Sequence, residues 1–476
     1  MSRLWSLDFE LWGAFGSGLW FPLFFQCTAV LRCYSSRLVS SEPRVQSPEP
    51  KAKDALLSRE LGVRQLAAVI FNYTVGSGIF VLPAVVAAQL GAPAILAYLA
   101  CAFIMALSVI CFAEAGSRVS SSGGPYAYVE TAFGPLAGFL TGVLNVLSAL
   151  AAAAAVTAAF SASAAALIGT SSSLVQALLM AAVLIAAGAI NIRSVGGGAR
   201  LVEIAVAAKL VPLVLFVVVG AAFVRPESLS WSSSPSLLSV MSASGILIFA
   251  FLGIEGALQP SGEVRDPSRT VPRAVFLAIA GVVALYIAIQ VVAQGLLGSA
   301  LPDDRVAPLA QAAATVAGPA GRTLMLIGAT VSMFGFLCGT VLTGPRSLFA
   351  FAQAGLAPHA LAGVHSSRHT PHVAIAVYVA IALGLALSGS FEGLLILTNV
   401  SALLVYIGVA IAAWELRRRD VRAHGTPFVA PGGAAIPALT CAMIAGVLVA
   451  TVTRTEVVAV AAVLALSVVA YLLRRR

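Results

Sequence analysis

The stretch VGSGIFVLP, residues 75–83, lies inside an apolar segment that runs from about Leu66 to Leu90. Its two glycines and its serine are poor helix formers, and a turn without bulky side chains lets the backbone approach a ligand. Irregular backbone at membrane depth persists only where it lines a cavity within the protein. Free amides at the start of the second half-helix would then suit a carboxylate. The alternative is a helix-packing site made of small residues.

A second stretch of the same kind, GIEGALQP at residues 253–260, lies in another apolar segment, from Ile246 to Leu258. In both stretches a glycine is followed seven residues later by proline, as Gly76 and Pro83 in the first. Paired, glycine-interrupted segments in corresponding positions of two halves indicate the binding site of a membrane transporter.

Composition excludes a soluble protein. Hydrophobic residues make up 60% of the 476 residues and charged residues 10%, and the mean hydropathy is +0.98. Many uncharged runs reach the roughly 20 residues that span a bilayer as a helix, and the ten-residue alternation of a membrane β-barrel is absent. The net charge of +9 comes from basic residues that lie in short loops at the ends of the apolar segments and not along one binding surface, so no nucleic-acid partner is predicted. The spacing of the cysteines and histidines predicts neither a metal site nor a cofactor.

The expected fold is therefore an all-α polytopic membrane protein with twelve transmembrane helices. The predicted spans are residues 63–90, 93–117, 133–168, 173–192, 200–224, 238–258, 273–298, 321–352, 372–389, 393–415, 433–452 and 456–473. Arginines concentrate in alternate loops, which places both termini of this core on the cytoplasmic side. An additional helix before residue 40 would move the far N-terminus outside. Residues 1–60 are taken as an extension and linker without an assigned function.

Four stretches carry a resemblance to a known family: GSGIFVLP at 76–83, SSGGPYAYVETAFGPLAGF at 121–139, FAFLGIEGALQPSGEVRDPSRTVPRA at 249–274 and GPRSLFAFAQAGLAPHALAGVH at 344–365. Together they resemble the amino acid–polyamine–organocation (APC) superfamily of amino-acid permeases over roughly residues 60–475. The resemblance implies a LeuT-like five-plus-five inverted repeat, with broken helices 1 and 6 around the substrate. The first repeat would span 61–225, the second 238–418, and two trailing helices 430–476.

The resemblance also implies a substrate site. Its residues are Val75, Gly76, Ser77, Gly78, Phe249, Ala250, Gly253, Phe336 and Gly339. Backbone amides at 76–78 and the Ser77 hydroxyl would bind the substrate carboxylate, and carbonyls freed at 249–253 would accept hydrogen bonds from its amino group. Two opposed half-helix dipoles suit a zwitterion in this arrangement. Phe249 falls where many members carry an aromatic gate, and residues of the span 321–352 would line the side-chain pocket.

Two ionisable residues within the predicted spans are candidates for a role in coupling. Lys209 lies about nine residues, or roughly 13 Å, into its segment. In several sodium-independent members of the superfamily a lysine on the fifth helix takes the place of a sodium ion. Lys209 could therefore hold the first helix against the fifth and release a proton, since burial disfavours the charged form. Glu255, in the second interrupted stretch, could carry a proton as well. The alternative for each is a purely structural hydrogen bond. Another carboxylate, Glu114, precedes Arg118 by four residues, which predicts a structural ion pair.

The function expected from these features is sodium-independent secondary active transport across the cytoplasmic (plasma) membrane, namely proton-coupled uptake of neutral L-amino acids. The alternative is an amino-acid exchanger, with a cationic amino acid or polyamine as substrate if Glu255 faces the site. A membrane enzyme would need a nucleophile–base pair or metal ligands at membrane depth, and the histidines fall only in predicted loops or at helix starts. No phosphate-binding loop or channel-type selectivity motif is evident. The sequence does not specify an oligomeric state.

Overall fold

The computed structural model describes residues 62–119, 123–193, 195–231, 234–258, 264–366, 368, 370–422 and 426–474, with backbone only for 195–207 and 474. The extension 1–60 and the end of the second interrupted stretch, residues 259–260, lie outside the described residues. Every regular element in the described part is a helix.

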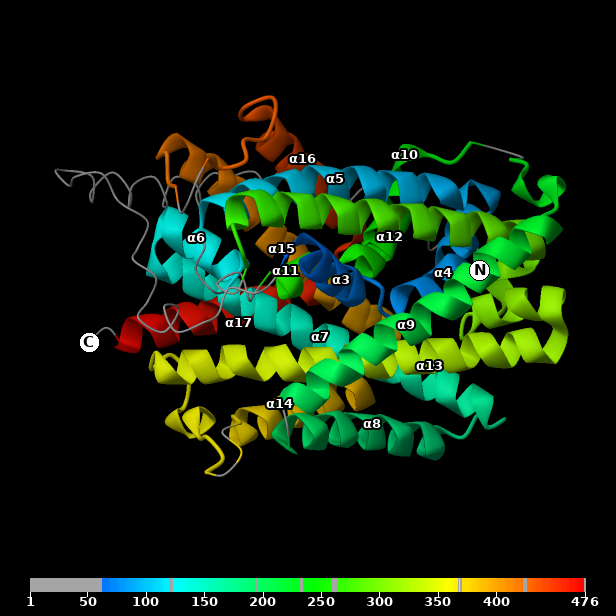
Figure 1. Cartoon of the computed structure of the whole chain (residues 1–476), viewed down its shortest axis with the longest axis horizontal. Helices are drawn as coiled ribbons and strands as arrows, with labels where there is room; N and C mark the ends of the chain where they lie inside the picture. Colours follow the sequence, from blue (N-terminus) through cyan, green and yellow to red (C-terminus); the bar gives the residue numbers. More distant parts are fainter. Residues whose placement is uncertain are drawn as a thin grey trace, which may run out of the picture. The chain divides into compact units, whose positions relative to one another are not determined.

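Fifteen α-helices are described, and their order along the chain can be followed by colour in Figure 1. They are α3 (Val63–Thr74), α4 (Gly78–Leu90), α5 (Ile95–Arg118), α6 (Pro125–Phe133), α7 (Pro135–Leu167), α8 (Ser173–Arg193), α9 (Val195–Gly220), α10 (Leu237–Leu247), α11 (Ile254–Ala257), α12 (Pro267–Leu297), α13 (Pro308–Gln353), α14 (His372–Ser388), α15 (Phe391–Arg418), α16 (Ala435–Thr451) and α17 (Arg454–Arg474). Short 3-10 helices connect several of them: η2 (Ala92–Ala94), η3 (Ala221–Phe223), η4 (Pro226–Leu229), η5 (Ile248–Phe251), η7 (Gly298–Asp303) and η8 (His359–Ala362).

Local sequence signals account for several helix boundaries. The helices α6, α7, α12 and α13 all begin at a proline, whose missing N–H is no loss in the first turn. Gly134, with φ of +91°, separates α6 from α7, and Gly298, with φ of +56°, follows α12. The side chain of Ser390 caps α15 by accepting a hydrogen bond from the Gly393 amide at 3.1 Å.

The helices are suited to a bilayer. Eight helical segments of the described chain are long and apolar enough to span a membrane, one of them being α10, η5 and α11 taken together, or nine with the bent pair α3–α4 taken as one span. Three shorter apolar helices, Ala208–Phe223, His372–Ser388 and Ala435–Thr451, coincide with the remaining predicted spans. The protein is thus a multi-pass helical membrane protein, whereas the count of twelve, the inverted repeat and the orientation remain predictions.

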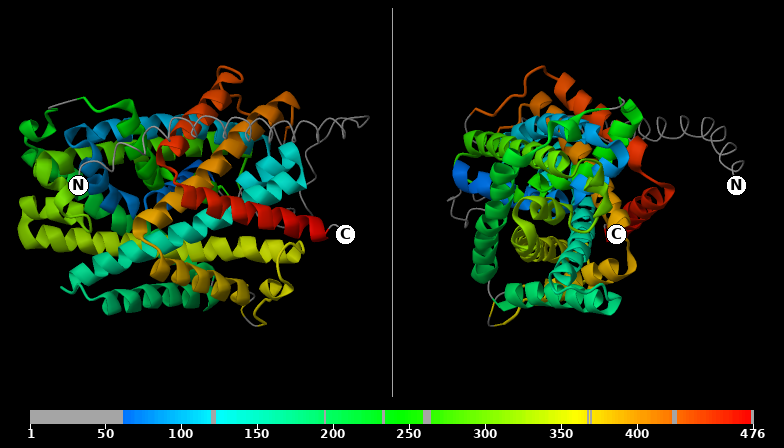
Figure 2. Two further views of the ribbon diagram at one scale, coloured as in Figure 1. Left: turned by 180° about the vertical axis from the view of Figure 1, so that it is seen from behind. Right: turned by 90° about the vertical axis from the view of Figure 1, so that its right-hand side faces the viewer.

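Large apolar side chains are exposed on the outer helices, as a lipid environment requires. Examples are Ile185 on α8, Val218 on α9 and Leu466 on α17, which are 59%, 66% and 69% exposed. The helices α8 and α14 pack on each other at the lower edge of the views in Figures 1 and 2. The helices α3 and α11 instead contact one another near the centre of Figure 1. These two central elements flank the two interrupted stretches.

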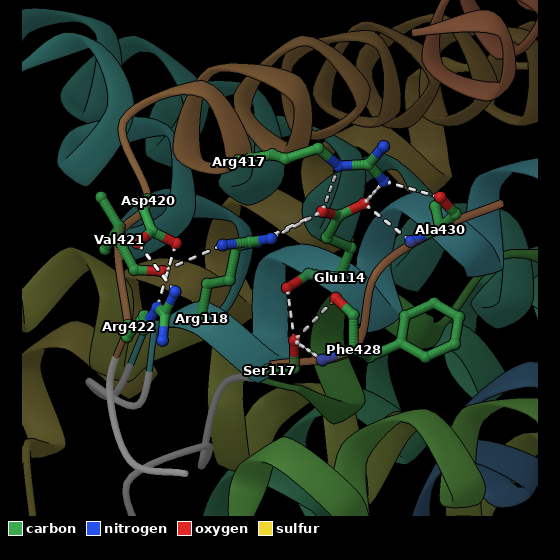
Figure 3. A network of polar contacts seen from close by, with 9 residues as sticks. All are labelled: Glu114, Ser117, Arg118, Arg417, Asp420, Val421, Arg422, Phe428 and Ala430. Carbon is green, nitrogen blue, oxygen red and sulfur yellow. Dashed lines mark hydrogen bonds and ion pairs between the residues drawn. The ribbon is translucent and has the colours of Figure 1, made fainter. Parts of the chain in front are cut away.

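A buried ionic cluster joins α5, α15 and the segment between α15 and α16 (Figure 3). The Glu114 carboxylate, 1% exposed, pairs with Arg118 at 3.1 Å and with Arg417 of α15, and accepts from the Ala430 amide at 3.2 Å. Arg118 also donates to the Val421 carbonyl at 3.1 Å. The predicted Glu114–Arg118 pair is confirmed, and Glu114 additionally anchors two distant parts of the chain.

Replacing Glu114 with alanine is expected to destabilise the protein by about 3–5 kcal/mol, because the buried guanidinium of Arg118 and the partly buried one of Arg417 lose their counter-ion. The midpoint of thermal unfolding in detergent measures this effect. Glu392→Ala is the control, since its carboxylate is 65% exposed and lies 3.9 Å from an exposed Arg305, a kind of pair that contributes about 0–1 kcal/mol. Equal midpoints for the two variants would show that the cluster does not hold these segments together.

Candidate functional site

The first interrupted stretch is broken in the structure. Helix α3 ends at Thr74 and α4 begins at Gly78, and the two helices are bent by 49°. The Val75 amide still donates to the Phe71 carbonyl at 2.9 Å, and the Gly76 amide donates to the Thr74 carbonyl at 2.9 Å. The first amides of α4 have no preceding helical turn to supply acceptors, and they lie at the positive end of the helix dipole. The end of this break, residues 75–77, and the start of α4 therefore present donors suited to an anion.

The second stretch is also interrupted. Helix α10 ends at Leu247, η5 covers Ile248–Phe251, and α11 begins only at Ile254. Between them Leu252 is extended and Gly253 has φ of +133°, a backbone conformation that residues other than glycine rarely adopt. A Cβ atom at Gly253 would lie 2.7 Å from the backbone carbonyl carbon of Tyr73. Glycine is thus required here both by conformation and by the close approach of α3.

The two breaks lie against each other. A Cβ atom at Gly78 would be 2.8 Å from both the Cα and the Cβ of Ala250, so the start of α4 touches the backbone of η5. Together with the contact between Gly253 and Tyr73, this packing leaves no room for a side chain at either glycine. The small residues therefore serve close helix contact as well as exposing backbone.

One cavity is formed where the breaks meet α7, α13 and α15. Its lining residues are Tyr73, Thr74, Gly76, Ser77, Gly78, Asn145, Val146, Ser148, Ala149, Ala152, Val156, Phe249, Leu252, Gly253, Glu255, Gly256, Phe336, Thr340, Thr343, Gly344, Ser347 and Thr398. Hydroxyl groups and one amide are interleaved with apolar side chains. Among these described lining residues Glu255 is the one charged side chain. Such a mixture of apolar walls and a few polar groups is typical of a small-molecule site.

Six of the nine residues predicted for the substrate site line this cavity: Gly76, Ser77, Gly78, Phe249, Gly253 and Phe336. The structure places the other three behind its wall, where their carbonyls accept hydrogen bonds. The Val75 carbonyl accepts from Lys209 at 2.7 Å, that of Ala250 from Tyr286 at 2.9 Å, and that of Gly339 from the Tyr73 hydroxyl at 3.3 Å. These three residues hold the wall through their backbone.

Polar residues of two long helices were not predicted. Asn145 and Ser148 on α7 line the cavity, as do Thr340, Thr343 and Ser347 on α13. On each helix they are spaced by three or four residues along the sequence, which puts them on one face. This polar stripe on an otherwise apolar span was a signal that could have located them.

Ser77 has an unsatisfied polar group. The residue is 1% exposed, it lines the cavity, and its hydroxyl has no hydrogen-bond partner among the described residues. Buried polar groups are almost always paired, so an unpaired hydroxyl beside a cavity indicates a place for a ligand or water. Its position at the start of α4 adds a side-chain donor to the backbone amides there.

Glu255 lines the cavity from the first turn of α11, and it is 8% exposed. Its Oε2 atom accepts hydrogen bonds from the Gly253 amide at 3.0 Å and from the Tyr406 hydroxyl at 2.7 Å. The carboxylate thus stabilises the break and faces the cavity at once. The two roles considered for Glu255 are compatible in this geometry.

Lys209 is fully buried on α9 and donates to α3. Its Nζ lies 2.7 Å from the Asn72 carbonyl, 2.6 Å from the Asn72 Oδ1 and 2.7 Å from the Val75 carbonyl. Three acceptors match the three donors of an ammonium group. Two of them are carbonyls at the C-terminal end of α3, which have no partner within the helix itself. Lys209 therefore anchors the first break to α9.

These features define a multi-pass membrane protein with a polar cavity between two broken helices. Residues 61–473 match the sequence profile of the amino acid permease family, and the chain belongs to this family, within the APC superfamily.

Named relatives of the chain are transporters. It is 27% identical over 413 residues to the methylthioribose transporter of Bacillus subtilis (strain 168), covering 83% of this chain and 89% of that protein. It is 27% identical over 390 residues to the serine/threonine exchanger SteT of the same organism, covering 79% and 88%. It is 28% identical over 348 residues to the large neutral amino acids transporter small subunit 2 of Mus musculus, covering 68% and 65%. The chain is accordingly a membrane transporter.

Proposed function

We propose that this protein is a secondary active transporter that takes up neutral L-amino acids by sodium-independent, proton-coupled symport. The observation that carries the proposal is that the two helix breaks face one cavity from adjacent positions. A zwitterion needs donors for its carboxylate and acceptors for its ammonium group, and two opposed half-helices supply both.

In this proposal the substrate carboxylate binds the amides at the start of α4 and the unpaired Ser77 hydroxyl. The ammonium group is directed to backbone carbonyls around Phe249 and Gly253, which line the cavity on its other side. The substrate side chain lies among the apolar residues of the cavity, such as Val156 and Phe336. Val75, Ala250 and Gly339 act indirectly, through the backbone of the wall.

A neutral substrate is favoured because the described lining of the cavity offers a single carboxylate, and that carboxylate is already hydrogen-bonded. Oε2 of Glu255 accepts from two donors of the protein. The side chain of a cationic substrate would need the Glu255 carboxylate as its own counter-ion. The second candidate function is amino-acid exchange, which also admits a cationic substrate. It is favoured by the position of Glu255 in the cavity and by the similarity to an exchanger.

Sodium independence and proton coupling are proposed from Lys209. Its ammonium group already occupies the carbonyls of Asn72 and Val75, which are acceptors of the kind a small cation would need. A buried lysine can exchange a proton in place of binding a metal ion. Loss of that proton would leave the amine with two donors for three acceptors and would weaken the attachment of the end of α3 to α9. Glu255, the charged residue of the cavity wall, is the second group proposed to take part in coupling.

The test is transport by the purified full chain in liposomes. Radiolabelled L-amino acids and methylthioribose are offered with an imposed pH gradient, with a sodium gradient, or with unlabelled amino acid inside. We expect saturable uptake of neutral amino acids that an inward proton gradient drives and that sodium does not affect. Uptake that needs internal amino acid and ignores the pH gradient would identify an exchanger. Transport of methylthioribose without any amino acid would contradict the proposal.

Replacing Glu255 with glutamine separates charge from hydrogen bonding. The glutamine side chain keeps an oxygen that can accept from the Gly253 amide and the Tyr406 hydroxyl. The rate of counterflow of neutral amino acids is therefore expected to stay within about threefold of the wild-type rate, a smaller change than the loss of one hydrogen bond would cause. Proton-driven accumulation is expected to fall, because the titratable group is gone. Glu415→Gln, a carboxylate paired with Arg418 and Arg419 away from the cavity, is the control. If proton-driven accumulation is unchanged in Glu255→Gln, Glu255 takes no part in proton coupling.

A further inference from the structure

A tyrosine hydroxyl joins the two helix breaks. Tyr286 lies on α12 and is fully buried. Its hydroxyl is 3.1 Å from the carbonyl of Thr74, the last residue of α3, and 2.9 Å from the carbonyl of Ala250 in η5. One carbonyl thus belongs to each broken helix, and the donor comes from a third helix.

The ring of Tyr286 is held in place independently of its hydroxyl. It packs edge-on against the ring of Phe251, with centroids 5.0 Å apart and an interplanar angle of 73°. Aromatic pairs of this geometry are favourable beyond the area they bury. Removing the hydroxyl alone therefore leaves the ring packed and withdraws the donor from both carbonyls.

The two carbonyls lie so close to the cavity that a small displacement of either one would change the shape of the cavity. Thr74 lines the cavity, and Ala250 packs against Gly78, which lines it too. The hydroxyl has one proton, and both carbonyls lie within hydrogen-bond reach of it. A group that attracts both carbonyls at once sets their separation. It acts beside Lys209, which holds the neighbouring Val75 carbonyl from the α9 side.

We propose that Tyr286 is a positioning residue that fixes the two breaks relative to each other and thereby sets substrate affinity. The part of this inference that concerns affinity rests on the proposed function. Without the hydroxyl, the Thr74 and Ala250 carbonyls lose a shared donor, and the donors for the carboxylate and the acceptors for the ammonium group lose their fixed spacing. Each substrate molecule must then restore that spacing as it binds.

The test compares Tyr286→Phe with Tyr98→Phe. Tyr98 on α5 is also fully buried, but its hydroxyl has no partner among the described residues, so its removal breaks no hydrogen bond there. The first measurement is hydrogen exchange of peptides that cover residues 71–81 and 247–257 in the full chain without substrate. We expect faster exchange in both peptides for Tyr286→Phe and in neither for Tyr98→Phe. Exchange that rises in one peptide alone, or in none, overturns the positioning role.

The second measurement is the kinetics of counterflow for the amino acid that the wild-type protein transports. For Tyr286→Phe we expect KM to rise about 10-fold with a maximal rate within about twofold, the size of effect that one lost hydrogen bond produces. Tyr98→Phe should match the wild type. A purely structural role would instead lower the maximal rate with the amount of folded protein, at unchanged KM, and would overturn the affinity role. If the wild type carries no amino acid, the proposed function fails while the exchange measurement still decides the positioning role.

Discussion

Replacing Gly78 with alanine is expected to reduce transport about 100-fold, the loss that a misplacement of roughly 1 Å can cause at a binding site. The added Cβ would lie 2.8 Å from the Cα and Cβ of Ala250, a separation that real Cβ atoms do not adopt. Because one of these atoms belongs to the backbone, no side-chain rotation relieves the clash. The two breaks must move apart, and the cavity between them changes shape.

The matched control for Gly78 is Gly384 on α14. A Cβ atom there would have nothing within 4 Å, so Gly384→Ala makes the same chemical change without a clash. Transport in liposomes and the midpoint of thermal unfolding are measured for both variants. We expect Gly78→Ala to remain folded and to lose transport, and Gly384→Ala to match the wild type. Transport by Gly78→Ala close to that of the control would contradict the close approach of the two breaks.

Replacing Lys209 with alanine is expected to abolish the dependence of uptake on a proton gradient. The substitution removes the titratable ammonium group and leaves three buried acceptors, two on Asn72 and one on Val75, without their donor. An unpaired buried acceptor costs about 1–3 kcal/mol, so affinity is expected to fall as well. Some counterflow should remain, because Lys209 does not line the cavity.

Asn72→Ala is the matched control for Lys209. It removes the Oδ1 contact but leaves Lys209 with two backbone carbonyls as acceptors. If Lys209 exchanges the proton, Asn72→Ala keeps its response to the gradient and Lys209→Ala does not. Gradient-driven uptake that persists in Lys209→Ala would leave the lysine with an anchoring role only. Equal loss of gradient response in both variants would also argue against titration.

The interruptions of the helices were predictable because their signals are local. Glycines at 76, 78 and 253 within apolar segments indicate breaks without knowledge of the neighbours. Helix α3 does end at Thr74, just before the first two, and η5, which continues α10, ends at Phe251, just before Gly253. The Glu114–Arg118 pair was predictable for the same reason, since four residues make one helical turn. The pairing of Glu114 with Arg417 joins residues 303 apart and depends on how α5 and α15 pack.

The composition of the cavity was less predictable. A residue at a break offers either its side chain or its backbone to the site, and sequence alone does not say which. Val75 and Ala250 turn their carbonyls to Lys209 and Tyr286, so they support the wall from behind. Asn145 on α7 faces the cavity only because of the rotation of that helix in the bundle. The role of the Tyr286 hydroxyl could not be predicted from the sequence, because its two partners lie 212 and 36 residues away along the chain.

The most direct test of the proposed binding site is an electron cryomicroscopy structure of the full chain with a transported amino acid bound. We predict density for the ligand in the cavity between the two breaks. Its carboxylate should lie within hydrogen-bond distance of the Ser77 hydroxyl and the first amides of α4, and its amino group should face the carbonyls around Gly253. Density for the ligand elsewhere in the protein, or an empty cavity at saturating substrate, would contradict this site.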